Sequence, residues 1–330
     1  MIRLDRTISV VLCISMILFL SAQVAAAQLQ TRTAQDRRDH SAAAVGSSHI
    51  LQIGGAAIQV DFAPGPFDLD REDILKWVEG SAQAVTIYYG RFPVSRARIL
   101  IVPVGGERGV VQGTTWGDRD GFQGFTRMRV GQQTTLEDLS EDWMLTHEMT
   151  HMALASLPDK QHWLEEGLAT YVEPIARAQA GQLAPEKVWG DMVRDMPKGE
   201  PAIDDRGLDQ THTWGRTYWG GAMFCLVADV EIRRQTGNRK SLQDALRAIV
   251  ASGNTIDKDD SLPHVLIAGD RATGTTVLTE MYKTWKDKPI EVDLSALWNE
   301  LGIQRDGVRL RLSSTTALAG IRQAITAAHK

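Results

Sequence analysis

The sequence predicts an α+β protein in which a small β-sheet lobe is followed by a mainly helical lobe. Two observations carry this prediction. Four short runs with the composition of strands occur between residues 50 and 130, and proline and glycine bound the run at 99–104. After residue 175 the apolar residues instead recur mostly with helical spacing. We therefore expect an α/β lobe over residues 48–180 and a mainly helical lobe over residues 181–330.

The N-terminal 27 residues have the composition of a secretory signal peptide. Arg3 and Arg6 precede an apolar run over residues 8–20, and Ala25-Ala26-Ala27 offers a small-residue cleavage site. We expect cleavage after Ala27, export to the periplasm or the medium, and no stable membrane insertion afterwards. An uncleaved N-terminal anchor is the alternative. The polar residues 28–47 are predicted to form a disordered leader.

Charge and cysteine content narrow the function classes. Loss of the signal peptide removes two arginines and one aspartate, so the formal net charge changes from −5 to −6. This mild acidity argues against a nucleic-acid partner. Cys225 is then the remaining cysteine and lies in an apolar segment, where we expect it to be buried. Without a disulfide the chain must rely on its hydrophobic core, and about 300 residues suffice for one.

The segments of the first lobe follow from their apolar patterns. A helix is expected over about residues 70–88, where apolar residues recur at helical spacing. The glycine-rich stretch 105–113 fits no phosphate-loop pattern and is interpreted as a turn. Strands are expected at Ile50–Ile53, Ile58–Phe62, Ile99–Val104 and Phe122–Val130.

Helices predominate beyond residue 175. Polar loops are expected at residues 197–215 and 254–261, since both stretches are rich in loop-forming residues. A strand is expected at Val308–Leu312 and a terminal helix at Ala317–Ala328.

The segment His147-Glu148-Met149-Thr150-His151 has the pattern H-E-x-x-H. Two histidines four residues apart lie on one face of a helix, so both imidazoles can reach a single ion. Glu148 would then hold the zinc-bound water as a general base. We expect this segment within one helix that Ser140 caps and that ends at Leu157-Pro158.

A catalytic zinc ion needs a third protein ligand, and the following helix offers two carboxylates. We expect this helix to begin near Asp159 and to run through Tyr171 or Glu173. Glu165 and Glu166 point about 100° apart around its axis, so only one of them can face the metal. Periodicity alone leaves the choice between them open.

The segment Trp163-Leu164-Glu165-Glu166-Gly167-Leu168-Ala169 resembles the W-x-x-E-G segment of gluzincins, the clan of aminopeptidase N-like and glycyl aminopeptidase-like metallopeptidases. The resemblance implies a thermolysin-like catalytic domain with the zinc site between its two lobes. It also implies that Glu166 is the third ligand of one Zn²⁺ per chain. Glu165 is then either solvated or bonded to a group beside the ligands.

A second segment strengthens the resemblance. Thr217-Tyr218-Trp219-Gly220-Gly221-Ala222 and the stretch through Leu246 are similar to the Y-x-K-G-A segment and its continuation in the glycyl aminopeptidase-like family. The resemblance implies that Tyr218 hydrogen-bonds the oxyanion of the reaction. Gly220 replaces the family's lysine. No G-x-M-E-N segment, which anchors the substrate amino group in aminopeptidase N-like enzymes, precedes His147, so the resemblance leaves endopeptidase activity open.

Three further features are candidates for substrate contact. In gluzincins an edge strand beside the zinc helix binds extended substrate, and the resemblance suggests Thr126–Val130 for this role. A purely structural edge strand is the equal alternative. Arg216 and His212 lie in or next to the loop that precedes Tyr218, and either is a candidate to bind substrate; surface hydrogen bonding is the alternative.

Together these features predict a secreted zinc metallopeptidase that hydrolyses peptides or proteins. His147, His151 and Glu166 would bind the zinc ion, Glu148 would be the general base, and Tyr218 would stabilise the oxyanion. The alternatives are a zinc hydrolase of a non-peptide substrate and a non-catalytic peptide-binding protein that retains the zinc site.

Overall fold

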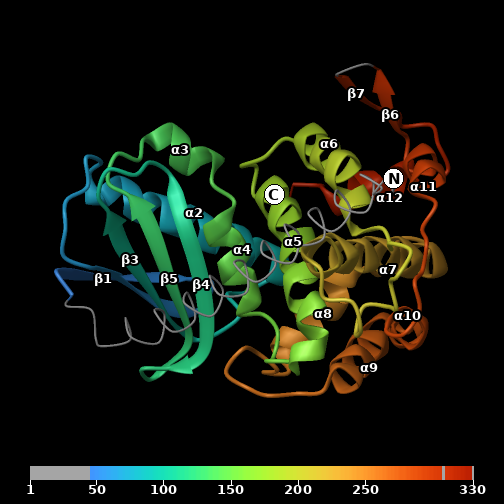
Figure 1. Cartoon of the computed structure of the whole chain (residues 1–330), viewed down its shortest axis with the longest axis horizontal. Coiled ribbons are helices and arrows are strands. Elements are labelled where there is room, and N and C mark those ends of the chain that lie inside the picture. The colour runs from blue at the N-terminus through green and yellow to red at the C-terminus, as the bar shows by residue number, and fades with distance from the viewer. Residues whose placement is uncertain (1–44, 307–308, 329–330) are drawn as a thin grey trace, which may run out of the picture. The chain divides into compact units, whose positions relative to one another are not determined.

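A five-stranded mixed sheet occupies the first part of the computed structural model, which describes residues 45–306 and 309–328 (Figure 1). The strand order is β1-β2-β3-β5-β4. The predicted signal peptide and residues 28–44 of the predicted leader lie outside the described residues. The strands are β1 (Ser47–Ile53), β2 (Ala56–Phe62), β3 (Arg96–Val104), β4 (Val110–Arg119) and β5 (Phe122–Gly131).

Two tight hairpins, one helical crossover and the loop at residues 105–109 connect the five strands. Gly54 and Gly55 join β1 to β2 and both have positive φ, as a two-residue turn between antiparallel strands requires. Asp120 and Gly121 join β4 to β5 in the same way. Strand β2 pairs in parallel with β3, so the chain must cross over between them, and helix α2 (Arg71–Tyr89) does so.

Helix α2 covers one face of the sheet. Glu72 and Asp73 lie in its positively polarised first turn, and Gly90 ends it in the left-handed conformation. Its apolar side meets the alternating inward side chains of the strands, and each such burial contributes about 1.5–3 kcal/mol. The fully buried strand residues are Ile58, Val60, Phe62, Ile99, Ile101, Met128 and Val130.

Helices make up most of the chain after the sheet, so the structure is a mixed α/β fold with a small sheet and many helices. The described residues from Gly46 onward form one compact unit, and the principal hydrophobic core contains residues from both sides of position 180. The helices are α3 (Leu136–Glu141), α4 (Met144–His151), α5 (His162–Gln179), α6 (Pro185–Asp195), α7 (Gly221–Thr236), α8 (Leu242–Ala251), α9 (Leu262–Thr273), α10 (Val277–Trp285), α11 (Leu294–Glu300) and α12 (Ala319–Ile325).

Shorter elements complete the helical part. A 3₁₀ turn at Asp159–Gln161 precedes α5, another at Met196–Gly199 follows α6, and a π-helical turn at Arg216–Gly220 leads into α7. Strands β6 (Ile303–Asp306) and β7 (Arg309–Leu312) form a separate two-stranded sheet. Among the described residues, no helix is long and apolar enough to cross a membrane.

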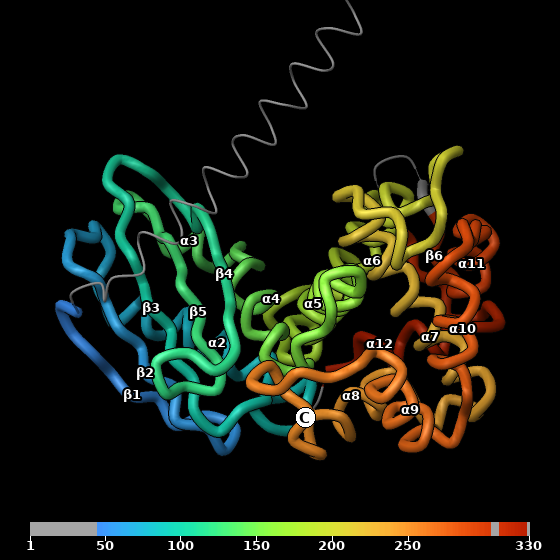
Figure 2. The backbone as a smooth tube through the Cα atoms, turned by 60° about the horizontal axis from the view of Figure 1, so that its bottom comes forward, coloured from blue at the N-terminus to red at the C-terminus, as the bar shows by residue number. Residues whose placement is uncertain are grey.

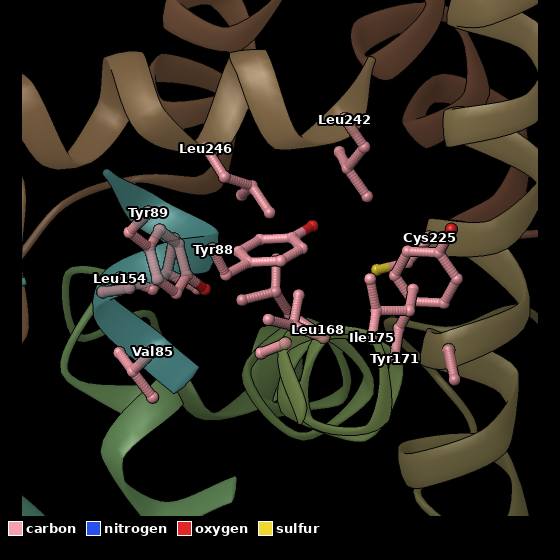
Figure 3. Close-up of a cluster of buried hydrophobic side chains, with 14 of the residues drawn as sticks. Val85, Tyr88, Tyr89, Leu154, Leu168, Tyr171, Ile175, Cys225, Leu242 and Leu246 are labelled. Atoms are coloured by element: carbon pink, nitrogen blue, oxygen red, sulfur yellow. The ribbon is translucent and has the colours of Figure 1, made fainter. Parts of the chain in front are cut away.

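Helix α5 lies at the centre of the packing. Figure 3 shows Leu168 and Ile175 of α5 among side chains of α2, α7 and α8, with Cys225 buried as predicted. Tyr171 donates a hydrogen bond to Asp229 Oδ2 at 2.9 Å, and Asp229 Oδ1 accepts bonds from Arg233 Nε and Leu242 N. This buried network joins α5, α7 and the start of α8.

The predicted strands at 50–53, 58–62, 99–104 and 122–130 and the helix at 70–88 are confirmed with small shifts of their ends. The interpretation of residues 105–113 as a turn is correct only up to Gly109, because strand β4 begins at Val110. The predicted helix from Ser140 to Leu157 is wrong. Asp142 adopts an extended conformation that separates α3 from α4, and α4 ends at His151.

Close contact between α5 and α7 gives a stability prediction. A Cβ atom at Gly167 would lie 2.3 Å from Gly221 Cα, so Gly167→Ala is expected to lower the free energy of unfolding by about 1–3 kcal/mol. Gly190→Ala in α6 is the control: its Cβ would meet nothing within 4 Å, and we expect a gain of roughly 0.4–1 kcal/mol. Denaturant titration measures both. Equal stability of the two variants would contradict the prediction.

Candidate metal centre

Helix α4 holds both histidines of the H-E-x-x-H segment. The Asp142 carboxylate accepts hydrogen bonds from the backbone N–H groups of Met144 and Leu145, both at 3.1 Å, and so caps the start of the helix in place of Ser140. The His147 and His151 rings lie edge to face, with centroids 4.9 Å apart. Both therefore face the same side of α4, as their spacing predicts.

Helix α5 brings its carboxylate to the same point. Glu166 Oε2 lies 3.1 Å from His147 Nε2 and 3.7 Å from His151 Nε2. The side chains of His147, His151 and Glu166 are only 6%, 14% and 12% exposed. Glu165 instead accepts a hydrogen bond from the backbone N–H of Leu157 at 2.9 Å. The tertiary structure thus resolves the geometric choice between the two neighbouring glutamates.

These three side chains fit a zinc ion. One ligand atom from each lies within 4.8 Å of the others. In a tetrahedral zinc site, ligand atoms about 2.0–2.1 Å from the ion lie roughly 3.3 Å from each other, close to the two separations observed here. Two imidazoles and one carboxylate are also a ligand set of catalytic zinc sites.

The electrostatics suit a cation. Burial lowers the pKa of His151 to about 4, which leaves its imidazole neutral at pH 7 with a lone pair for a metal. Burial acts against ionisation of Glu166, but the hydrogen bond from His147 and the charge of the neighbouring histidines lower its pKa to about 2. The cluster therefore offers an ionised carboxylate at Glu166 and a neutral imidazole at His151.

Glu148 lies beside the cluster and is fixed by strand β4. The Thr115 hydroxyl donates to Glu148 Oε2 at 2.7 Å and lies 2.9 Å from the Thr126 hydroxyl. Gly113 faces the same carboxylate: a Cβ there would lie 2.6 Å from Glu148 Cγ. Burial raises the pKa of Glu148, which makes it a stronger base.

Tyr218 approaches from the helical part. It lies in the π-helical turn at Arg216–Gly220, and such turns are frequent at functional sites. Its ring stacks on the His147 ring with centroids 6.4 Å apart. It also stacks on the ring of the exposed Trp214, with centroids 5.6 Å apart. Burial and a hydrogen bond with Glu166 raise the pKa of Tyr218, so its hydroxyl stays protonated.

The structure does not bring Arg216 and His212 into this site. Arg216 pairs with Asp205 at 2.7 Å, with both side chains at most 3% exposed, and it donates to the carbonyl of Gly199. A buried guanidinium needs such a partner, so Arg216 anchors the π-helical turn. His212 is exposed and lies outside the cavity lining.

The predicted edge strand is also wrong. Residues 126–130 belong to β5, which lies between β3 and β4, and Thr126 is fully buried. Strand β4 is the edge instead. It follows the glycine-rich turn and pairs in antiparallel fashion with the outer side of β5. The sequence contains a strand signal here that the interpretation as a turn did not use. It consists of the β-branched and aromatic residues Val110, Val111, Thr114, Thr115 and Trp116.

A cavity of about 640 Å³ joins these groups. Its lining includes His147, Glu148, His151, Glu166 and Tyr218 together with β4 residues 111–117. Figure 2 shows the loop between α8 and α9 reaching the sheet, where Ile256 lines the cavity. A Cβ at Gly117 would lie 1.9 Å from Ile256 O, so glycine permits this contact. Sequence reasoning missed Thr115, Gly113 and His162 among the groups at the site.

No protein-family model and no curated protein matches this sequence. Solved structures do match. An aminopeptidase N family protein from Idiomarina loihiensis aligns over 78% of this chain and 49% of its own, with 14% identity and a TM-score of 0.57. An M1 zinc metallopeptidase from Deinococcus radiodurans aligns over 75% of this chain and 52% of its own, with 15% identity and a TM-score of 0.48.

Yeast LTA4 hydrolase aligns over 77% of this chain and 42% of its own, with 15% identity and a TM-score of 0.47. This chain thus spans about half the length of the first two proteins and less than half the length of the third. At this identity the likeness concerns the fold. The resemblance to aminopeptidase N-like gluzincins is confirmed at that level: the chain has a mixed α/β fold similar to that of an aminopeptidase N family protein.

Proposed function

We propose that this protein is an exported zinc metallopeptidase that hydrolyses peptide bonds. One observation carries the proposal: two imidazoles and a carboxylate from α4 and α5 converge on one point of a cavity that Glu148 and Tyr218 also line. A structural metal site has no need of a free carboxylate and a phenol beside it. A hydrolytic site needs both a base and an oxyanion donor.

His147, His151 and Glu166 would hold the zinc ion, one per chain. When bound, Zn²⁺ supplies a Lewis acid for the scissile carbonyl and the attacking water. Glu148 accepts the proton of that water and later passes it to the leaving amine. The Thr115 hydroxyl fixes one oxygen of Glu148, so the carboxylate needs little reorganisation during the transfer. The Tyr218 hydroxyl donates to the carbonyl oxygen as negative charge develops.

Strand β4 is the proposed seat of the substrate backbone. Among the described strands, β4 has a neighbour only on the β5 side, and residues 111–117 line the cavity. An extended peptide can add there as a further strand, with its scissile bond beside Glu148. The proposed partners are therefore peptides or unfolded protein segments, and the mild negative charge of the chain supports no role with nucleic acid.

Glu148→Gln tests the proposed general base. The variant is expected to keep zinc, because Glu148 is not among the three ligands, and to lose roughly 10²–10⁴-fold in turnover. The zinc-loaded protein and the variant are incubated with a mixed peptide library, and products are identified by mass spectrometry. Retained turnover in the variant would refute the assignment. No cleavage by the unmodified protein with zinc bound would favour a non-peptide hydrolase or a binding protein.

Tyr218→Phe tests the oxyanion donor. Loss of one preorganised donor is expected to lower kcat by about 10²–10³-fold while zinc binding persists. Tyr89→Phe is a matched control, because the Tyr89 hydroxyl is buried in the core and has no hydrogen-bond partner among the described residues. Steady-state kinetics compares the two. Equal kcat values would indicate that Tyr218 only packs its ring.

Gly113→Ala tests the approach of β4 to Glu148. The added Cβ would lie 2.6 Å from Glu148 Cγ, so the carboxylate or the strand must move. A displacement of about 1 Å at a reacting group can cost 10²-fold in rate, and we expect a loss of that order in kcat. Gly105→Ala, whose Cβ makes only an ordinary contact at 3.9 Å, is the control and should be nearly neutral. An unchanged kcat in Gly113→Ala would contradict this account.

A further inference from the structure

His162 forms a bridge between the two neighbouring glutamates of α5. Its Nδ1 lies 2.9 Å from Glu165 Oε2, and its Nε2 lies 3.3 Å from Glu166 Oε1. His162, Glu165 and Glu166 occupy positions i, i+3 and i+4 of one helix, so all three side chains share a face. Each ring nitrogen therefore meets a different carboxylate.

The far end of the bridge is tied to the backbone. Glu165 Oε1 accepts the N–H of Leu157, in the segment between α4 and α5, at 2.9 Å. A continuous path thus runs from the Leu157 backbone through Glu165 and His162 to Glu166. The Glu165 side chain is 21% exposed and the His162 side chain 53% exposed, so the bridge forms part of the cavity wall.

The two oxygens of Glu166 have different partners. Oε2 faces His147 and His151, whereas Oε1 faces His162. A free carboxylate rotates about its last side-chain bond, and its rotamer wells there are broad. A partner on Oε1 restricts that rotation and keeps Oε2 directed at the histidines. Groups that orient a metal ligand in this way commonly change metal affinity by about 10–100-fold.

We propose that His162 and Glu165 are positioning residues that orient the Glu166 carboxylate for metal binding. The proposal rests on the zinc site of the proposed function. It does not depend on peptidase activity, since its consequence is a change in metal affinity. The bridge depends on His162, four residues before Glu166, and gives the first glutamate of the Glu165-Glu166 pair a role beside the metal site.

The test measures zinc affinity of the full chain by competition with a chromophoric chelator. His162→Ala is expected to weaken zinc binding about 10–100-fold, and Glu165→Ala is expected to weaken it less, because the contact of His162 with Glu166 remains. His264→Ala is the matched control: His264 also pairs with a carboxylate four residues away, Asp260 at 2.7 Å, but lies outside the cavity lining. It should leave zinc affinity unchanged.

Two conservative variants separate positioning from a general effect of the side chain. The amide nitrogen of glutamine can stand in for Nε2 of histidine, whereas that of asparagine can stand in only for Nδ1. His162→Gln is therefore expected to restore most of the zinc affinity that His162→Ala loses, and His162→Asn is not. The visible spectrum of the Co²⁺-substituted protein provides a second readout, since a change in the geometry of Glu166 alters the metal's absorption bands.

The outcomes are distinguishable. Weaker zinc binding in His162→Ala with rescue by His162→Gln supports the proposal, even if no peptide is cleaved. Unchanged zinc affinity and Co²⁺ spectrum in His162→Ala overturn it, and a lower kcat or higher KM in that variant would then indicate contact with substrate. Failure of the unmodified chain to bind zinc would overturn both this proposal and the proposed function.

Discussion

The approach of helix α5 to helix α4 is the contact on which the rest of the site depends. It brings the Glu166 carboxylate within hydrogen-bonding distance of His147, and both side chains are mostly buried. A buried carboxylate is costly unless it is paired, and the neighbouring histidines are its partners. Helix α7 also packs closely against α5, because Gly167 and Gly221 leave no room for a side chain between the two helices. Helix α5 is thus held from both sides, and this fixes where Glu166 can lie.

The sheet contributes chemistry through its edge. Strand β4 reaches the cavity because glycine at position 113 removes the side chain that would otherwise displace Glu148. The next residue but one, Thr115, then hydrogen-bonds the same carboxylate. A single edge strand therefore orients the proposed base and lines the cavity.

The helical part contributes through one irregular turn. Tyr218 lies in a π-helical turn that Arg216 ties to Asp205 and to the carbonyl of Gly199. Arg216 was a candidate for substrate binding because it lies two residues from Tyr218. In the structure its charge is neutralised inside the protein, so it acts on the site through the position of the turn. Sequence proximity to a functional residue could not distinguish these two roles.

Local geometry was determined by the sequence itself. The spacing of His147 and His151 fixes both on one helical face whatever surrounds them, and the alternating apolar residues of β2 and β3 fix which face of the sheet is buried. Contacts distant in sequence were decided only by the tertiary structure. They select Glu166 over Glu165, make β4 the edge, break the predicted helix at Asp142, and bury Arg216. These outcomes depend on which segments pack together, and short-range periodicity carries no information about partners that lie far along the chain.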